Sequence, residues 1–75
     1  MISVGIIGAS GFTGAELLRI CASHPHFEVK YATGDSQAGT LARSLYPSLA
    51  ATYPNLVFEE FELAKALACD VVFLG

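Results

Sequence analysis

Three glycines spaced three residues apart separate an apolar run from a helix-like run near the start of the chain. The stretch is Gly8-Ala9-Ser10-Gly11-Phe12-Thr13-Gly14. Where a strand turns into a helix, the first backbone N–H groups of the helix have no partner within it, and the helix dipole favours an anion beside them. Glycines allow a diphosphate to approach those N–H groups, and Gly14 allows the helix to lie close to the strand. The stretch therefore predicts a phosphate-binding turn, although its G-x-x-G-x-x-G spacing differs from the common G-x-G-x-x-G fingerprint.

The segments on either side of this turn are those of a βαβ unit. Residues 2–7 are nearly all apolar, as in a parallel strand covered on both faces. An apolar stripe then recurs at helical spacing through Gly14, Leu17, Leu18 and Cys21, and Pro25 ends this helix. Residues 27–33 alternate between apolar and polar types, as in a second strand. We expect a right-handed crossover between the two strands.

The start of this helix has two alternatives. Thr13 and Glu16 have the spacing of a capping box, and a start nearer Ser10 is equally compatible with the sequence.

The remainder of the chain predicts shorter elements of the same architecture. Residues 34–55 are loop-rich with a short helix near 41–45, and residues 55–58 are a brief third strand. A helix over 61–68 and a fourth strand over 71–74 complete the pattern. The predicted fold class is α/β, a Rossmann-like doubly wound parallel sheet of which this chain is the N-terminal half, with strand order 3-2-1-4.

Residues 8–19, followed by His24-Pro25, resemble the opening of the N-acetyl-gamma-glutamyl-phosphate reductase family. The shared pattern is a glycine, two small residues, a glycine, an aromatic residue, Thr or Ser, a glycine and then Glu-Leu-x-Arg. Looser similarity continues through Ala38-Gly39, Tyr46-Pro47-Ser48-Leu49 and residues 70–75, and so covers most of the chain. Aspartate-semialdehyde dehydrogenases share the glycine spacing, but we do not expect Phe-Thr-Gly-x-Glu-Leu from them.

The resemblance implies a function for the whole enzyme. It would reduce N-acetyl-γ-glutamyl phosphate to the semialdehyde in arginine biosynthesis, through a cysteine thioester and hydride from NADP(H). That cysteine lies beyond the region of similarity, so no catalytic residue is expected here. A homo-oligomer is also implied. Two alternatives stay open: a semialdehyde dehydrogenase of the aspartate or aminoadipate type, and a non-catalytic NAD(P)-binding sensor module.

The residues expected to bind the cofactor fall into two groups. Those at the diphosphate are Gly8, Ser10, Gly11, Phe12, Thr13 and Gly14, and those at the adenosine ribose are Thr33, Gly34, Asp35 and Ser36. The family usually has a Ser-Arg pair in the second group, which suits a 2′-phosphate. Asp35 departs from this pattern, because a carboxylate accepts hydrogen bonds from a free ribose 2′-OH and repels a 2′-phosphate. NADP is therefore the expected cofactor, NAD is an alternative, and a solvated turn residue is an equal interpretation of Asp35.

Composition and charge exclude several classes of partner. The net charge is −3 and no basic stripe occurs, so we expect no nucleic-acid partner. Neither a charged leader nor a span long enough for a bilayer is visible, which predicts a cytoplasmic protein without membrane contact. The glutamates at 59, 60 and 62 are expected at a helix N-terminus rather than at a metal.

The cysteine and histidine residues do not predict a catalytic or metal site. Cys21 lies on the apolar stripe and Cys69 at the end of a helix, and both are expected to be small core residues without a disulfide. His24 and His26 flank a turn proline and lack further ligands, so no metal site is predicted.

The chain has a high apolar content for its length. Hydrophobic residues make up 53% of 75 residues. We therefore expect residues 1–75 to be the N-terminal part of an NAD(P)-binding domain, with the remainder of that domain and a catalytic domain absent from this chain.

Overall fold

Strand β1 (Ile2–Ile7) is the centre of a three-stranded parallel sheet in this computed structural model, which describes residues 1–75. β2 (Phe27–Ala32) and β3 (Val71–Leu74) lie on either side of it, in the order β2-β1-β3. Val4 of β1 is in register with a residue of each neighbouring strand. Its side chain is fully buried, as expected of a central parallel strand.

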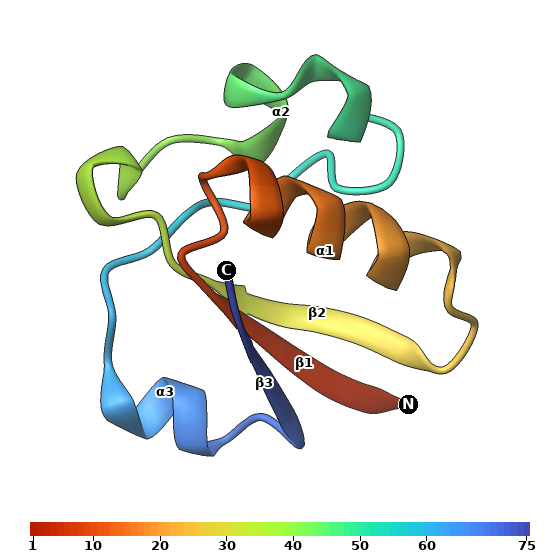
Figure 1. The fold of residues 1–75 in the computed structure, drawn as a ribbon, viewed down its shortest axis with the longest axis vertical. Coiled ribbons are helices and arrows are strands. Elements are labelled where there is room, and N and C mark those ends of the chain that lie inside the picture. Colours follow the sequence, from red (N-terminus) through yellow and green to blue (C-terminus); the bar gives the residue numbers. More distant parts are fainter.

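Helix α1 (Phe12–Ser23) covers one face of the sheet, and α3 (Leu63–Leu67) lies on the opposite side, as Figure 1 shows. The predicted apolar stripe of α1 faces inward, since Gly14, Leu18 and Cys21 are buried and Leu17 is half-buried. The helix ends before Pro25, as predicted. The sheet and its two helical layers confirm the α/β, Rossmann-like class.

The hydrophobic core lies between the sheet, α1 and the long segment that follows β2. Its nine buried members are Val4, Ile6, Ala9, Leu18, Cys21, Ala32, Ala42, Leu49 and Phe58. Tyr53 closes this core by donating its hydroxyl proton to the Leu18 carbonyl at 2.6 Å. Burial, with a smaller contribution from Cys21, raises the pKa of Tyr53 to about 12, so the hydroxyl stays protonated as this donor.

Several short elements connect β2 to β3. They are a 3₁₀ turn η1 (Asp35–Gln37), helix α2 (Ala42–Leu45), a second 3₁₀ turn η2 (Pro47–Leu49) and α3. The helix predicted near 41–45 is confirmed as α2, and the strand predicted over 71–74 is confirmed as β3. The helix predicted over 61–68 is shorter at both ends. None of the helices has the length and apolar character needed to cross a bilayer.

The predicted third strand over 55–58 is wrong, and the strand order 3-2-1-4 is corrected accordingly. This segment divides its hydrogen bonds between two partners. Val57 forms an isolated antiparallel bridge with Leu41, and Glu59 forms an isolated parallel bridge with Thr33 at the end of β2. Because the segment changes partner within two residues, no continuous ladder forms. The order of the remaining strands, with β1 between its neighbours, agrees with the prediction.

The capping box predicted from Thr13 and Glu16 is also absent. The N-cap of α1 is Gly11, and no side chain caps the helix. Thr13 therefore lies inside the first turn, where its hydroxyl cannot serve as the cap. Glu16 pairs instead with Arg19, at 2.6 Å on the exposed face of the helix.

Candidate functional site

The glycine turn between β1 and α1 is bound to the end of β2. The backbone N–H of Gly8 donates to the Thr33 hydroxyl at 2.9 Å, and that of Ala9 donates to the Thr33 carbonyl at 2.7 Å. The Ser10 hydroxyl donates to the Gly34 carbonyl at 3.2 Å. The structure thus brings the two predicted groups of cofactor-binding residues together at one edge of the sheet.

Two glycines of the turn are required by the backbone itself. Gly8 has φ +78, a conformation that residues with a side chain rarely adopt. At Gly14, an added Cβ would lie 2.4 Å from Ala9 Cα and 2.6 Å from the Gly8 carbonyl oxygen. Gly14 therefore allows a close backbone approach, but the backbone that it meets is that of the turn and not the strand that was predicted.

Gly11 is different, because its missing side chain leaves open space. Its φ of −83 is ordinary, and an added Cβ would meet no atom within 4 Å. The same stretch carries a row of free donors. None of the backbone N–H groups of residues 10–14 donates a hydrogen bond within the protein. Free N–H groups at the start of a twelve-residue helix, with neither a side-chain cap nor an acidic residue in the first turn, suit an anion such as a diphosphate.

The side chains around this row leave it accessible. Phe12 is 86% exposed and Thr13 is exposed, so neither is part of the core. The Ser10 hydroxyl is engaged with Gly34, which leaves its backbone N–H as its free donor.

The loop after β2 supplies the second predicted group. Thr33 is only 1% exposed, and its hydroxyl is occupied by Gly8, so that hydroxyl is not available to a ribose. Gly34 packs against Phe58, whose Cβ would be 2.7 Å from an added Cβ. Asp35 and Ser36 are exposed beyond this pair, and Asp35 has φ 46 in the left-handed region. Asp35 forms no ion pair and is open to solvent.

One residue at the turn was not among the predicted site residues. The Tyr46 hydroxyl donates to the Ser10 carbonyl at 2.7 Å, across 36 positions of the sequence. The sequence marks Tyr46 only through the Tyr-Pro-Ser-Leu similarity. A long-range contact of this kind has no local signal.

The cysteines and histidines take structural positions. Cys21 is a core residue, as predicted, and burial raises the pKa of its thiol. The prediction of a core position is wrong for Cys69, which is half-buried at a cavity wall with its thiol directed to the Lys65 carbonyl. Both thiols are free. His24 stacks on Phe27 with ring centroids 3.9 Å apart, and its Nδ1 accepts from the His26 N–H. No group of three metal-ligating side chains occurs in the structure.

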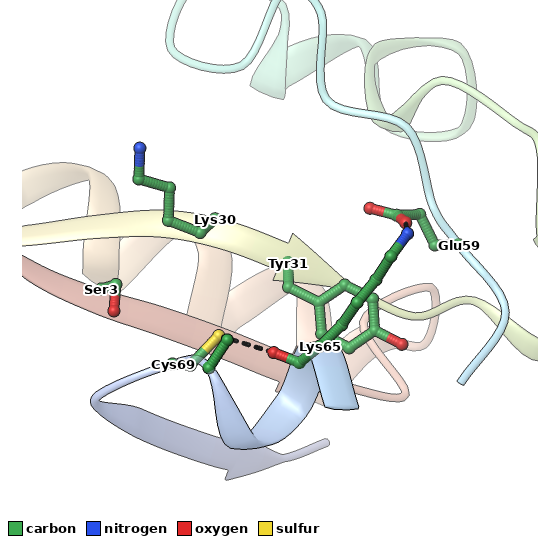
Figure 2. A pocket seen from close by; sticks show the side chains of 7 residues that line it. Ser3, Lys30, Tyr31, Glu59, Lys65 and Cys69 are labelled. Carbon is green, nitrogen blue, oxygen red and sulfur yellow. Dashed lines mark hydrogen bonds and ion pairs between the residues drawn. The ribbon is translucent and has the colours of Figure 1, made fainter. Parts of the chain in front are cut away.

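A cavity of about 540 Å³ lies away from the glycine turn, beside α3 (Figure 2). Its walls include Ser3, Lys30, Tyr31, Glu59, Lys65 and Cys69. Both lysines are paired, Lys30 with Glu28 at 3.2 Å and Lys65 with Glu59. Glu59 also raises the pKa of Lys65, mainly by hydrogen bonding. The cavity therefore offers no unpaired cation to a phosphate, and none of the predicted cofactor residues lines it.

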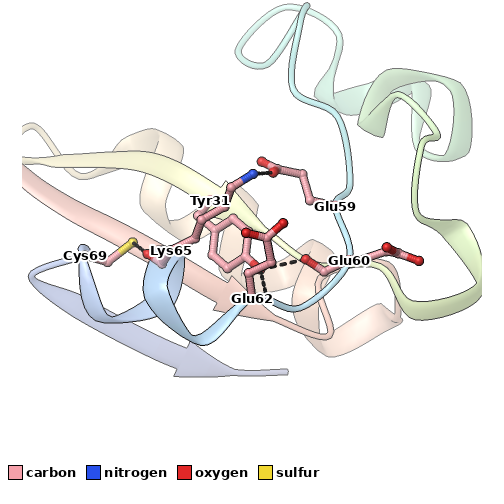
Figure 3. Close-up of polar contacts among 6 residues, drawn as sticks. All are labelled: Tyr31, Glu59, Glu60, Glu62, Lys65 and Cys69. Carbon is pink, nitrogen blue, oxygen red and sulfur yellow. Dashed lines mark hydrogen bonds and ion pairs between the residues drawn. The ribbon is translucent and has the colours of Figure 1, made fainter.

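The contacts that fix the start of α3 are drawn in Figure 3. The buried Tyr31 hydroxyl donates to the Glu60 carbonyl and accepts from the Glu62 N–H, each at 2.7 Å. Glu62 is the N-cap position of α3. The prediction that the glutamates precede a helix is confirmed.

Known proteins resemble the chain over its full length. Residues 3–75 match the family described as "Semialdehyde dehydrogenase, NAD binding domain". The N-acetyl-gamma-glutamyl-phosphate reductases of Ectopseudomonas mendocina and Pseudomonas aeruginosa are 49% and 45% identical to it over 75 residues. These matches cover 100% of this chain and 22% of each relative, so the chain spans about a fifth of their length.

A solved structure confirms the arrangement of the elements. The aspartate semialdehyde dehydrogenase of Candida albicans, crystallised with NADP, superposes with a TM-score of 0.84 and 28% identity. The alignment covers 100% of this chain and 23% of that one. The chain belongs to the semialdehyde dehydrogenase family, and residues 3–75 are part of its nicotinamide dinucleotide-binding domain.

Proposed function

We propose that residues 1–75 are the N-terminal part of the cofactor-binding domain of an NADP-dependent N-acetyl-gamma-glutamyl-phosphate reductase. The observation that carries this proposal is the open row of N–H donors at residues 10–14, in a chain 45–49% identical to reductases of that name throughout its length. Identity to the aspartate enzyme of solved structure is 28%, which favours the glutamyl over the aspartyl substrate.

The residues of this chain bind and orient the cofactor. Backbone N–H groups from Ser10 to Gly14 hold the diphosphate, and the missing side chain of Gly11 leaves it room. Gly34, Asp35 and Ser36 lie beside the adenosine ribose, with Thr33 beneath them holding the turn. The bound nicotinamide supplies the hydride that reduces the acyl group.

The preference between NADP and NAD depends on the charges near Asp35. Lys30 is paired with Glu28 and lines the cavity beside α3, so it is committed elsewhere. Arg43 is exposed on α2 and forms no ion pair, which leaves it as the free cation of this region. We expect NADPH to be accepted through Arg43, with a smaller preference over NADH than a Ser-Arg pair would give.

We expect the substrate-binding and catalytic residues to lie in the rest of the enzyme. The substrate is N-acetyl-γ-glutamyl phosphate, and we expect a homo-oligomer. No residue of 1–75 touches the reacting atoms in this proposal, and we expect no turnover from these residues alone. Cys21 is buried with a raised pKa and Cys69 faces the cavity beside α3, so neither is placed as the nucleophile.

The test uses the full-length gene product. NADPH binding is titrated by fluorescence, and turnover is measured with N-acetyl-γ-glutamyl phosphate and with its aspartyl and aminoadipyl analogues. Gly11→Val should weaken NADPH binding at least tenfold, because its side chain occupies the diphosphate position, while the fold is retained. Ala22→Val, at an exposed position of the same helix, is the matched control.

Each alternative function has its own outcome. Turnover of an analogue in preference to the glutamyl substrate would assign the chain to another semialdehyde dehydrogenase. NADPH binding without turnover of any acyl phosphate would favour a sensor module. Equal NADPH affinity for wild type and Gly11→Val would reject the diphosphate site.

A further inference from the structure

The hydroxyl of Tyr46 contacts the glycine turn at a single atom. It donates to the Ser10 carbonyl oxygen at 2.7 Å. No backbone N–H donates to that carbonyl, because α1 begins too late for Gly14 to reach it as a helical donor. Tyr46 is therefore the only hydrogen-bond partner of the Ser10 carbonyl within the protein.

This contact fixes the direction of one of the free donors. The carbonyl of Ser10 and the N–H of Gly11 belong to the same peptide unit, and none of the peptide bonds in the structure is cis. In a planar trans peptide the C=O and N–H groups point in opposite directions. With the carbonyl held toward the Tyr46 hydroxyl, the Gly11 N–H points away from Tyr46, and this N–H has no acceptor within the protein.

We propose that Tyr46 is a positioning residue for the cofactor diphosphate, acting through the Ser10–Gly11 peptide. The inference rests on the proposed function, since the ligand is the dinucleotide. Tyr46 does not touch the ligand in this proposal. Its hydroxyl keeps the Gly11 N–H in the direction needed to donate, so that binding does not have to rotate the peptide.

The fold provides a matched control for this role. Tyr53 lies on the same connecting segment and also donates its hydroxyl proton to a backbone carbonyl of the α1 region, that of Leu18 at 2.6 Å. Leu18 lies in the body of the helix, away from the free donors. Removing either hydroxyl removes one hydrogen bond. Only the Tyr46 hydroxyl is hydrogen-bonded to a peptide unit whose N–H is free, the Ser10–Gly11 peptide.

The experiment compares Tyr46→Phe and Tyr53→Phe in the full-length gene product. The readouts are the Kd of NADPH, the inhibition constant of adenosine 2′-phosphate against NADPH, and the thermal unfolding midpoint. Adenosine 2′-phosphate lacks the diphosphate and so does not use the Gly11 N–H. Both variants keep the aromatic ring that packs against the core.

We expect Tyr46→Phe to bind NADPH about fivefold more weakly, as for the loss of one well-formed hydrogen bond, with no change for adenosine 2′-phosphate. Tyr53→Phe should change the affinity for neither ligand. The thermal unfolding midpoint should fall to a similar extent in both variants. A purely structural role would weaken the binding of both ligands together.

The outcomes separate this inference from the proposed function. Unchanged NADPH affinity in Tyr46→Phe, equal losses for both ligands, or an equal NADPH loss in Tyr53→Phe would each overturn the positioning role. A wild-type protein that binds neither NADPH nor NADH would overturn the proposed function, and this inference with it.

Discussion

The hydroxyl of Thr33 accepts a hydrogen bond from the backbone N–H of Gly8 at 2.9 Å, although the two residues are 25 positions apart. This bond joins the end of β2 to the first glycine of the turn. Thr33 is 1% exposed and Gly8 is half-buried, so the bond is partly shielded from water. The position of the turn therefore depends on a side chain from the neighbouring strand.

Thr33→Val should loosen the turn, because valine has nearly the same shape and cannot accept from Gly8. Leaving the N–H of the half-buried Gly8 unpaired costs about 1–3 kcal/mol. The amide of Ala9, which donates to the Thr33 carbonyl, should then exchange its hydrogen roughly 5- to 150-fold faster. Thr33→Ser retains the hydroxyl and should exchange nearly as slowly as wild type. Equal exchange rates in Thr33→Val and wild type would contradict this role.

Gly14→Ala should destabilise the fold, whereas Gly11→Ala should not. A Cβ at Gly14 would lie 2.4 Å from Ala9 Cα, and a backbone atom at that distance cannot move aside alone. We expect a loss of about 1–3 kcal/mol in the free energy of unfolding, measured by urea titration. A Cβ at Gly11 meets nothing within 4 Å, so this variant should be as stable as wild type. A Gly14→Ala protein as stable as Gly11→Ala would show that the turn can move.

Asp35→Asn should raise the preference for NADPH over NADH. It removes the charge that opposes a 2′-phosphate, and asparagine tolerates the left-handed backbone at φ 46. One such charge at an exposed site contributes on the order of 1 kcal/mol, or about fivefold in the ratio of kcat/KM for the two cofactors. An unchanged ratio would mean that Asp35 does not face the ribose. Arg43→Gln, which removes the cation proposed to receive the 2′-phosphate, should shift the ratio in the opposite direction.

Asp70→Asn should reduce the acid sensitivity of the fold. The backbone N–H of Ser3, and then its hydroxyl, lower the pKa of Asp70 from its usual 3.8. A lowered carboxyl pKa stabilises the fold above the unfolded value, and this contribution is lost as the pH falls through the folded value. Between pH 6 and pH 2.5 the variant should therefore lose less stability than wild type in urea titrations. Asp35→Asn, at a carboxylate with no hydrogen-bond partner, is the control and should follow the wild-type curve.

The regular elements could be predicted because their signals are local. The apolar run of β1, the stripe of α1 and the alternation of β2 each depend on neighbours within a few residues, and all three are found where expected. The strand Val71–Leu74 has an equally clear local signal, a short apolar run after a helix. Residues 55–58 have the same local character as a strand, but Phe58 is buried in a segment whose hydrogen bonds go to two separate partners. Only the three-dimensional arrangement decides between a strand and two isolated bridges.

The glycines of the candidate site could be predicted from the sequence, but the side chains that hold the turn in place could not. Glycine spacing alone located Gly8 and Gly14, which the turn requires through a positive φ and a close backbone contact, and Gly11, where a side chain would meet nothing within the protein. The hydroxyls of Thr33 and Tyr46 act across 25 and 36 positions, and nothing near them in sequence marks the carbonyl or N–H that they meet. The sequence places Thr33 at the ribose, and the structure adds that its hydroxyl is buried and accepts from the Gly8 N–H.

The pairing of β1 with two strands far apart in the sequence also determines the order in which the sheet can form during synthesis. β2 is available to β1 early, since the bond from Gly8 reaches only 25 positions ahead, whereas Ser3 must wait for Asp70, 67 positions later. Chains are synthesised from the N-terminus at a finite rate, and the nearer contacts close first. During synthesis the glycine turn is therefore assembled on a sheet whose central strand still has one free edge. Unpaired strand edges attract other strands. Until β3 emerges, one edge of β1 is therefore open to pairing with another strand.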